Sequence, residues 1–276
     1  MNISAQDVNK LRQMTGAGMM DCKKALTEAN GNFEEAIIIL RKKGQKVSAS
    51  RADKEASEGA VFPLVNAQGN EGIIIALNCE TDFVAKNDEF QQLGQKIAQA
   101  ALAHKPANKE QLLALEIEGR TINDLIIDLV GKVGEKIEIS SYEVVQGEKV
   151  ISYVHLGSKL GVLVALTGVN GTDVSELGKD IALQIASMKP IAIDKEDINP
   201  AIIEKELEIA KEKARNEGKP EHILDKIAQG YLQSFYKENT LLNQTFVKDN
   251  SKTIAQLLKE HSANLKVAAF KRVSVA

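Results

Sequence analysis

The feature of this chain that most constrains its fold is an internal duplication with halves of unequal length. Residues 72–77 are Gly-Ile-Ile-Ile-Ala-Leu and residues 161–166 are Gly-Val-Leu-Val-Ala-Leu, an offset of 89 residues. Farther along the offset falls to 84 residues, between Leu93-Gly94, Ile97-Ala98 and Lys105-Pro106 and their counterparts Leu177-Gly178, Ile181-Ala182 and Lys189-Pro190. The first copy therefore carries five extra residues between its strand and its helix. Because connecting loops carry function more often than the elements they join, this junction is a candidate functional segment.

Composition favours a globular protein with a protein partner. The chain has 276 residues, of which 43% are hydrophobic, enough for two or more packed units. Lys and Arg number 35 against 38 Asp and Glu, a formal charge of −3, so no basic excess marks a nucleic-acid surface. Trp is absent and there are only 7 Phe and 4 Tyr, which leaves few rings to stack on bases. We expect no direct contact with nucleic acid.

The sequence offers little to catalysis, metal binding or membrane insertion. The two cysteines, Cys22 and Cys79, form no Cys-x-x-Cys pair and are expected to be reduced, buried thiols. No two of the four histidines have the short spacing that metal sites on helices use. They are His104, His155, His222 and His261. No apolar run is long enough to span a bilayer, and the N-terminus lacks the pattern of a secretory signal. These features predict a cytoplasmic protein with no catalytic residues, no metal and no cofactor of its own.

Three short helices are predicted at the N-terminus. Ser4 and Asp7 have the spacing of a capping box for the first helix, which ends at residues 16–18. A second helix is expected over about 20–29, and a third follows Asn32 and is expected to end at residues 41–44. With a polar linker, this gives a module over residues 1–55. Its size is near the lower limit for independent folding.

The first copy of the duplication predicts an α+β subdomain over residues 56–135. Two strands, within residues 60–65 and 73–77, are expected to form a hairpin. A helix with one apolar face follows from about Asp88, and two further helices are expected over 109–116 and 121–132.

The second copy predicts a related subdomain over residues 136–199 and 239–263. Strands are expected over 136–145, 150–156 and 160–166, followed by a helix over 174–188 and another over 253–261. Residues 264–276 are expected to form a separate C-terminal strand. The whole chain is therefore predicted to be α+β, with two related core subdomains.

Residues 200–238 interrupt the second copy and predict an antiparallel helical hairpin. Two sets of apolar residues each have spacings of 4, 3 and 4, and they are Ile203, Leu207, Ala210 and Ala214, then Leu224, Ala228, Tyr231 and Phe235. The hairpin either pairs with a second copy, giving a homodimer or a 2:2 complex, or buries its seam internally and projects as a spacer. The sequence leaves both interpretations open.

Three stretches resemble the signature sequences of the elongation factor Ts family. Residues 11–26 are Leu-Arg-Gln-Met-Thr-Gly-Ala-Gly-Met-Met-Asp-Cys-Lys-Lys-Ala-Leu, residues 81–87 are Thr-Asp-Phe-Val-Ala-Lys-Asn, and residues 246–249 with 253–258 resemble the third. One departure is Thr245, where the family would have proline. The resemblance spans the chain and implies a ubiquitin-associated-like N-terminal module and a coiled-coil hairpin. It also implies a guanine-nucleotide exchange factor that binds GDP-bound elongation factor Tu and promotes GDP release.

The resemblance also implies roles for particular residues. Those associated with displacing Mg²⁺ from the partner GTPase are Thr81, Asp82, Phe83 and Val84. Further partner contacts are implied for Leu11, Arg12, Met19, Met20, Lys23, Ala85, Lys86, Asn87, Phe246 and Val247.

From residue chemistry alone, two interpretations of this segment stay open. Phe83 could be an ordinary core residue and Thr81 or Asp82 the N-cap of the next helix, the interpretation that we would favour without the resemblance. With it, we expect the Phe83 ring to act as a wedge between elements of the partner, because an aromatic ring cannot ligate a metal. Asp82 would then hydrogen-bond the displaced partner groups or oppose the phosphates.

Two other functions compete with exchange. An RNA-binding accessory factor of translation could use residues 41–43 and Lys271-Arg272 as phosphate contacts, although short basic clusters at helix ends are usually capping charges. A ubiquitin-associated-type scaffold without exchange activity would leave the five extra residues unexplained.

Overall fold

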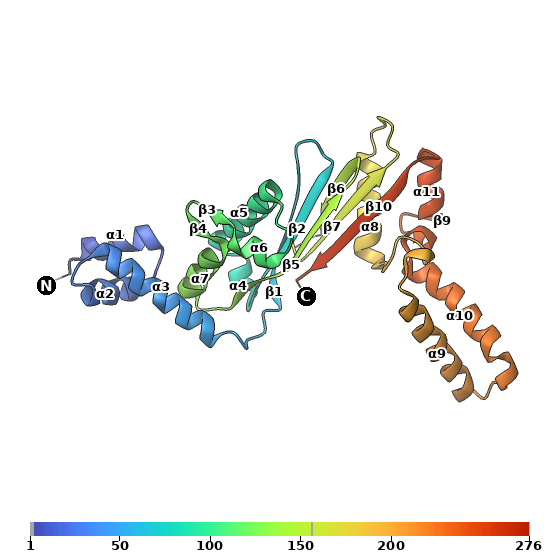
Figure 1. Ribbon diagram of the computed structural model, residues 1–276, viewed down its shortest axis with the longest axis horizontal. Helices are drawn as coiled ribbons and strands as arrows, with labels where there is room; N and C mark the ends of the chain where they lie inside the picture. The colour runs from blue at the N-terminus through green and yellow to red at the C-terminus, as the bar shows by residue number, and fades with distance from the viewer. Residues whose placement is uncertain (1–2, 156, 276) are drawn as a thin grey trace.

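The computed structural model describes residues 3–155 and 157–275. It is elongated, with the N-terminal helices at one end, two β-sheets in the middle and a helical hairpin projecting at the other end (Figure 1). The predicted α+β class is confirmed.

The N-terminal module consists of α1 (Ala5–Thr15), α2 (Met19–Glu28) and α3 (Phe33–Ser50). The predicted capping box is present, since the Ser4 side chain accepts from the backbone of Asp7 and the Asp7 side chain from that of Ser4. A small core made largely of aliphatic side chains holds the three helices together. The prediction that the third helix ends at residues 41–44 was wrong. Gly44 is buried against another helix, and α3 continues two further turns.

The first sheet has the order β1-β2-β5 and is antiparallel throughout. Its strands are β1 (Glu58–Val65), β2 (Glu71–Cys79) and β5 (Ile137–Gln146). Between β2 and β5 the chain forms α4 (Asp82–Ala85), α5 (Asp88–His104), α6 (Lys109–Ala114), β3 (Glu116–Ile117), β4 (Arg120–Thr121) and α7 (Ile122–Val133).

The second sheet has the order β10-β7-β6. Its strands are β6 (Lys149–Val154), β7 (Leu160–Thr167) and β10 (Lys266–Ser274). Between β7 and β10 lie α8 (Ser175–Met188), η1 (Lys195–Asp197), the helical hairpin, η3 (Leu241–Asn243), β8 (Thr245–Phe246), β9 (Asp249–Thr253) and α11 (Ile254–His261). The predicted end of the β6 strand at residue 156 lies outside the described residues.

Two predicted domain boundaries need correction. The strand over 136–145 was assigned to the second subdomain, but β5 pairs with β2 and completes the first sheet. The segment over 264–276 was assigned to a separate strand or module, but β10 pairs with β7 and completes the second sheet. Each half is therefore a hairpin followed by helices and a closing strand. The duplicated unit is longer than sequence similarity alone indicates.

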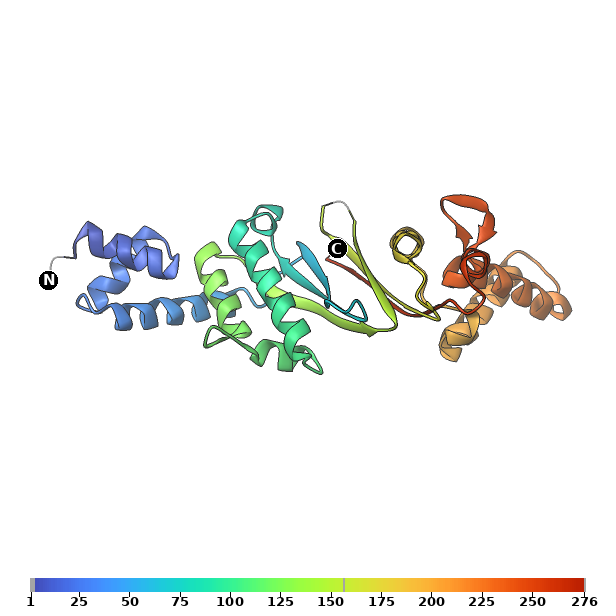
Figure 2. The ribbon, with the colours of Figure 1, turned by 90° about the horizontal axis from the view of Figure 1, so that it is seen from above.

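The two sheets pack face to face, with helices on both outer faces (Figure 2). In β2, Ile73, Ile75 and Leu77 point to the helices, whereas Ile74 and Ala76 point to the other sheet. The strand is buried on both faces, so its sequence is a continuous apolar run.

Residues repeated in the two halves occupy equivalent contacts. A side chain at Gly72 would meet Val150 and Leu163 of the other sheet, and one at Gly161 would meet Val61 and Ile74. The helix glycines Gly94 and Gly178 pack in the same way against Phe62 and Ile151. These close approaches explain why glycine recurs at both pairs of positions.

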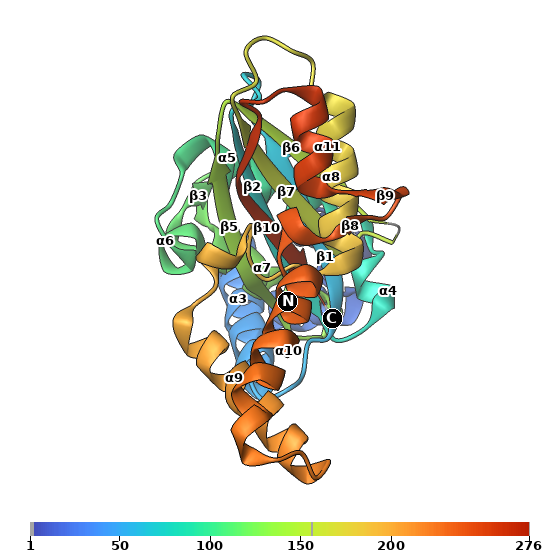
Figure 3. The ribbon, with the colours of Figure 1, turned by 90° about the vertical axis from the view of Figure 1, so that its right-hand side faces the viewer.

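The projecting hairpin consists of α9 (Pro200–Asn216) and α10 (Leu224–Asn239), joined through η2 (Glu221–Ile223) (Figure 3). Ala210 and Ala214 of α9 are buried, as are three residues of α10. The prediction that Tyr231 lies in the seam was wrong by one position. Leu232 is buried, while Tyr231 is exposed and its hydroxyl donates to Glu206 at 3.4 Å.

Candidate functional site

The extra residues of the first copy form a distinct turn between β2 and α5. Residues 82–85 make the single-turn helix α4, and Asn87 caps the following helix by accepting from the backbone N–H of Glu89 at 2.8 Å. The equivalent junction of the second copy, residues 168–174, contains no helical turn. The candidate segment is therefore a structural addition to the duplicated fold.

Phe83 projects from this turn into solvent. Its side chain is 83% exposed, while the next two residues, Val84 and Ala85, are buried in the core of the first half. Consecutive residues on a helix point about 100° apart, so anchoring this pair leaves the preceding ring outside. The interpretation of Phe83 as a core residue was wrong.

Polar contacts hold both ends of the turn. Thr81 is the N-cap, and its hydroxyl oxygen accepts from the backbone N–H of Val84 at 3.4 Å, so Asp82 is not the cap. Asp82 instead pairs with Lys86 at 2.7 Å across the outside of the turn. A hydrogen bond from Lys86 lowers the pKa of the Asp82 carboxyl below its usual value, so this side chain is an anion at neutral pH.

Two glutamates tie the turn to the start of β5. Glu135 accepts from the backbone N–H of Thr81 at 3.0 Å and from its hydroxyl at 2.7 Å. Glu80 accepts in return from the backbone N–H of Lys136 at 2.6 Å and from Arg51 at 3.1 Å. The sequence prediction missed Glu80 and Glu135. Only the β2–β5 register, which pairs Cys79 with Ile137, could have indicated them.

Cys79 lies beneath the turn as the last residue of β2. Its thiol donates to the backbone carbonyl of Thr81 at 3.2 Å and is fully buried. Burial, with the nearby Glu135 charge, raises the pKa of the Cys79 thiol to about 12. Cys79 and Cys22 are both free and buried, which confirms the prediction of buried thiols.

The N-terminal signature divides into an inner and an outer set of residues. Leu11 is fully buried in the module core, so it supports the surface from within and is not itself a contact. Arg12 and Lys23 are exposed. Met19 and Met20 are also exposed, at 41% and 66%. Both methionines therefore offer apolar surface.

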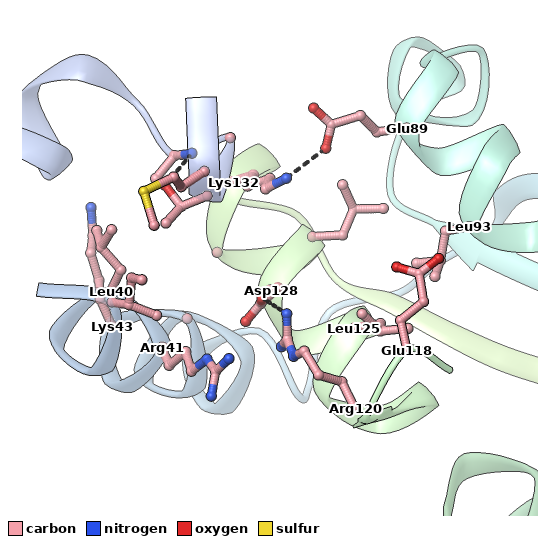
Figure 4. A pocket seen from close by; sticks show the side chains of 18 of the residues that line it. Leu40, Arg41, Lys43, Glu89, Leu93, Glu118, Arg120, Leu125, Asp128 and Lys132 are labelled. Atoms are coloured by element: carbon pink, nitrogen blue, oxygen red, sulfur yellow. Dashed lines mark hydrogen bonds and ion pairs between the residues drawn. The ribbon is translucent and has the colours of Figure 1, made fainter. Parts of the chain in front are cut away.

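A cleft of about 600 Å³ lies between the module and the first core half (Figure 4). Charged side chains line it, and several are paired: Lys132 with Glu89 at 2.8 Å and Arg120 with Asp128 at 2.6 Å. Lys43, also in the lining, pairs with Asp21. The cleft therefore separates the two units without presenting a cluster of free charge of one sign.

The first part of the third signature stretch, residues 246–249, lies in the small β8–β9 ribbon, and its second part leads into α11. Phe246 is buried in the core of the second half, whereas Val247 is 39% exposed. The buried amide of Gln184 holds this ribbon from below. Its nitrogen donates to the Thr245 carbonyl at 3.1 Å, and its oxygen accepts from the backbone N–H of Val247 at 2.9 Å. Val247 is therefore the outward member of the pair and Phe246 its anchor.

Within the described part of the chain, no group of three or more His, Cys, Asp or Glu residues could hold a metal ion. Nor does any helix in those residues have the length and apolar character needed to cross a bilayer. One of the two basic clusters, Lys271-Arg272, is engaged internally, since Lys271 pairs with Glu143 at 2.6 Å and Arg272 donates to the Ala186 carbonyl at 3.4 Å. The RNA-binding alternative therefore gains no support from this surface.

Exposed apolar side chains on firmly anchored turns are typical of surfaces that contact other proteins. Residues 80–276 match the family model described as elongation factor TS. An elongation factor Ts of Amoebophilus asiaticus is 58% identical over 275 residues, covering 100% of this chain and 99% of the relative. Those of Cytophaga hutchinsonii and Porphyromonas gingivalis are 56% and 52% identical, each covering at least 99% of both chains. The chain belongs to the elongation factor Ts family of translation elongation factors.

Proposed function

We propose that this chain is the guanine-nucleotide exchange factor of an elongation factor Tu. It binds the GDP-bound GTPase, displaces the partner's Mg²⁺ and promotes GDP release, so that GTP can bind during protein synthesis. The observation that carries the proposal is the Phe83 ring, 83% exposed at the tip of a turn that occurs in only one half of the duplicated fold.

An exchange factor must bind the nucleotide-free GTPase more tightly than the nucleotide-bound one. By reciprocal coupling, the same difference in free energy weakens nucleotide binding. A side chain that fits only after partner groups have moved supplies such a difference. A ring held away from its own core can enter the partner without first leaving a packed site.

One side chain cannot supply the whole effect. A nucleotide bound at nanomolar affinity is held by about 12 kcal/mol, whereas burying one Phe contributes about 1.5–3 kcal/mol. The remainder requires an interface above about 1,000 Å². We assign it to a surface that includes the exposed residues Arg12, Met19, Met20 and Lys23 of the module, Lys86 and Asn87 beside the wedge, and Val247 of the ribbon.

The test is release of labelled GDP from an elongation factor Tu of the same source. The intact chain should accelerate release, and Phe83→Ala should slow the accelerated rate by about tenfold to a hundredfold while complex formation survives. Ile191→Ala is a matched control, because Ile191 is 50% exposed and lies outside the candidate site. No acceleration by the intact chain would overturn the proposed function. An unchanged rate with folded Phe83→Ala would overturn the wedge role alone.

A further inference from the structure

We propose that Glu135 is a positioning residue for Phe83. Its carboxylate fixes the backbone from which the ring projects, although Glu135 itself does not contact the partner. The inference rests on the proposed function where it concerns exchange. It stands on geometry alone where it concerns the order of the turn.

The geometry places both oxygens of Glu135 on a single residue. One accepts from the backbone N–H of Thr81 at 3.0 Å and the other from its hydroxyl at 2.7 Å. Thr81 is the N-cap of α4, and the same hydroxyl oxygen accepts from the backbone N–H of Val84. One carboxylate therefore fixes the backbone and the rotamer of the residue that starts the turn.

The contact continues the pairing of two strands beyond their last rung. Cys79 of β2 pairs with Ile137 of β5, so the same register places Lys136 opposite Glu80 and Glu135 opposite Thr81. There each glutamate replaces a strand carbonyl as acceptor, Glu80 for the Lys136 N–H and Glu135 for the Thr81 N–H. Where the turn leaves the sheet, each of the two segments of the chain thus donates a backbone N–H to a glutamate of the other.

A turn this short needs such support. A four-residue helix is not stable by itself, because nucleation fixes several dihedrals for few hydrogen bonds. Val84 and Ala85 anchor it from within, but the exposed ring contributes no burial in the free protein. Fixing the turn before binding removes an ordering cost that association would otherwise bear.

Hydrogen exchange tests this role in the free protein. The amide of Glu135→Gln keeps one acceptor oxygen and replaces the other with a donor NH2 group, so the two acceptor atoms that receive the Thr81 N–H and hydroxyl are no longer both present. We expect the amides of Ala85, Lys86 and Asn87 to exchange about fivefold faster or more, with α8 unchanged. Glu138→Gln is the matched control, since Glu138 lies three residues farther along, in β5, and pairs with Lys136 at the surface. Unchanged exchange over 81–87 in Glu135→Gln would overturn the proposal.

A double-mutant cycle separates positioning from a general effect on stability. With Phe83 present, Glu135→Gln should slow stimulated GDP release by about tenfold relative to the intact chain. The double variant Phe83→Ala, Glu135→Gln should release GDP within about twofold of the rate of Phe83→Ala alone. An equal effect in both backgrounds, or none in either, contradicts the positioning role. If the intact chain fails to accelerate release, the proposed function fails, and hydrogen exchange still decides whether Glu135 orders the turn.

A second pair of variants covers the case in which Glu135→Gln does not fold. Thr81→Val removes the hydroxyl from the other end of the same contact, and Thr81→Ser restores it. We expect faster exchange over residues 81–87 in Thr81→Val and recovery in Thr81→Ser. Equal behaviour of the two variants would contradict the proposal.

Discussion

At the scale of single residues, burial of the Cys79 thiol makes stability depend on alkaline pH. Its pKa is raised to about 12 in the folded chain, chiefly by burial, whereas an unfolded cysteine titrates near 8.5. Between these values the unfolded chain releases the proton and the folded chain keeps it. The stability that the folded chain gains from keeping this thiol protonated is therefore fully present below about pH 8.5 and is lost as the pH rises toward 12.

We expect the melting temperature of the intact chain to fall more steeply between about pH 8 and pH 10 than that of Cys79→Ala. Thermal unfolding followed by circular dichroism at several pH values checks this. Because both variants share every other titrating group, the difference in slope isolates the thiol. Parallel slopes would show that Cys79 does not titrate differently in the two states.

The candidate site also shows which single residues a sequence can and cannot identify. Residue type made Thr81 predictable as a cap, whereas Asn87 was expected only as a contact that the family resemblance implies. Residue chemistry alone did not predict the exposure of Phe83, because apolar residues near helix starts usually pack inward, and here Val84 and Ala85 take that place. Glu135 acts across a contact between segments 54 residues apart in the chain, which no local pattern records.

At the scale of elements, the crossing of α3 and α7 fixes the module to the core. The two helices approach at Gly44 and Gly131, where a side-chain carbon added to Gly131 would lie 2.9 Å from the α-carbon of Gly44. Backbone at that distance cannot move aside without shifting a whole helix. The glycines thus set how closely the helices pack.

We expect Gly131→Ala to lower the free energy of unfolding by about 1–3 kcal/mol, because overpacking outweighs the gain in helix propensity. Gly230→Ala is the matched control: Gly230 is also within a helix, but an added carbon there meets open space. That variant should gain up to about 1 kcal/mol from propensity alone. Urea unfolding measures both, and equal stabilisation of the two variants would exclude a tight crossing.

The existence of most elements was predictable, whereas their partners were not. Helices and strands of both halves follow from apolar periodicity and turn residues. Strand pairing depends on distant segments, and β2 has no alternation to indicate its faces because both are buried. Gly44 misled the prediction for α3, since glycine marks helix ends and close helix crossings alike.

At the scale of the whole molecule, the projecting hairpin closes its own seam. Ala210, Ala214 and Ala228 are buried between α9 and α10 of one chain. This packing favours the interpretation in which the hairpin projects as a spacer. Of its outward residues, Ile202 and Ile209 are at least 40% exposed and lie two turns apart on one side of α9.

We expect the free chain to sediment as a monomer over about a hundredfold range of concentration, because the seam needs no second copy. Analytical ultracentrifugation provides the measurement. A sedimentation coefficient that rises with concentration would contradict the expectation. In that case Ile209→Glu should restore the monomer if the outward side of α9 forms the contact.

The placement of β10 determines the order in which a newly made chain can fold. The first sheet has all its strands once residue 146 has been synthesised, but the second sheet needs a strand that ends at Ser274. Until then, the edge of β7 that pairs with β10 remains open, and Val273 and Val275 are missing from the layer between the sheets. The side-chain amide of Asn78 in β2 donates to the Val275 carbonyl at 3.1 Å in the folded chain, and this bond also cannot form before Val275 has been added. A member of a family that serves protein synthesis thus completes its own core only after Ser274 has been added.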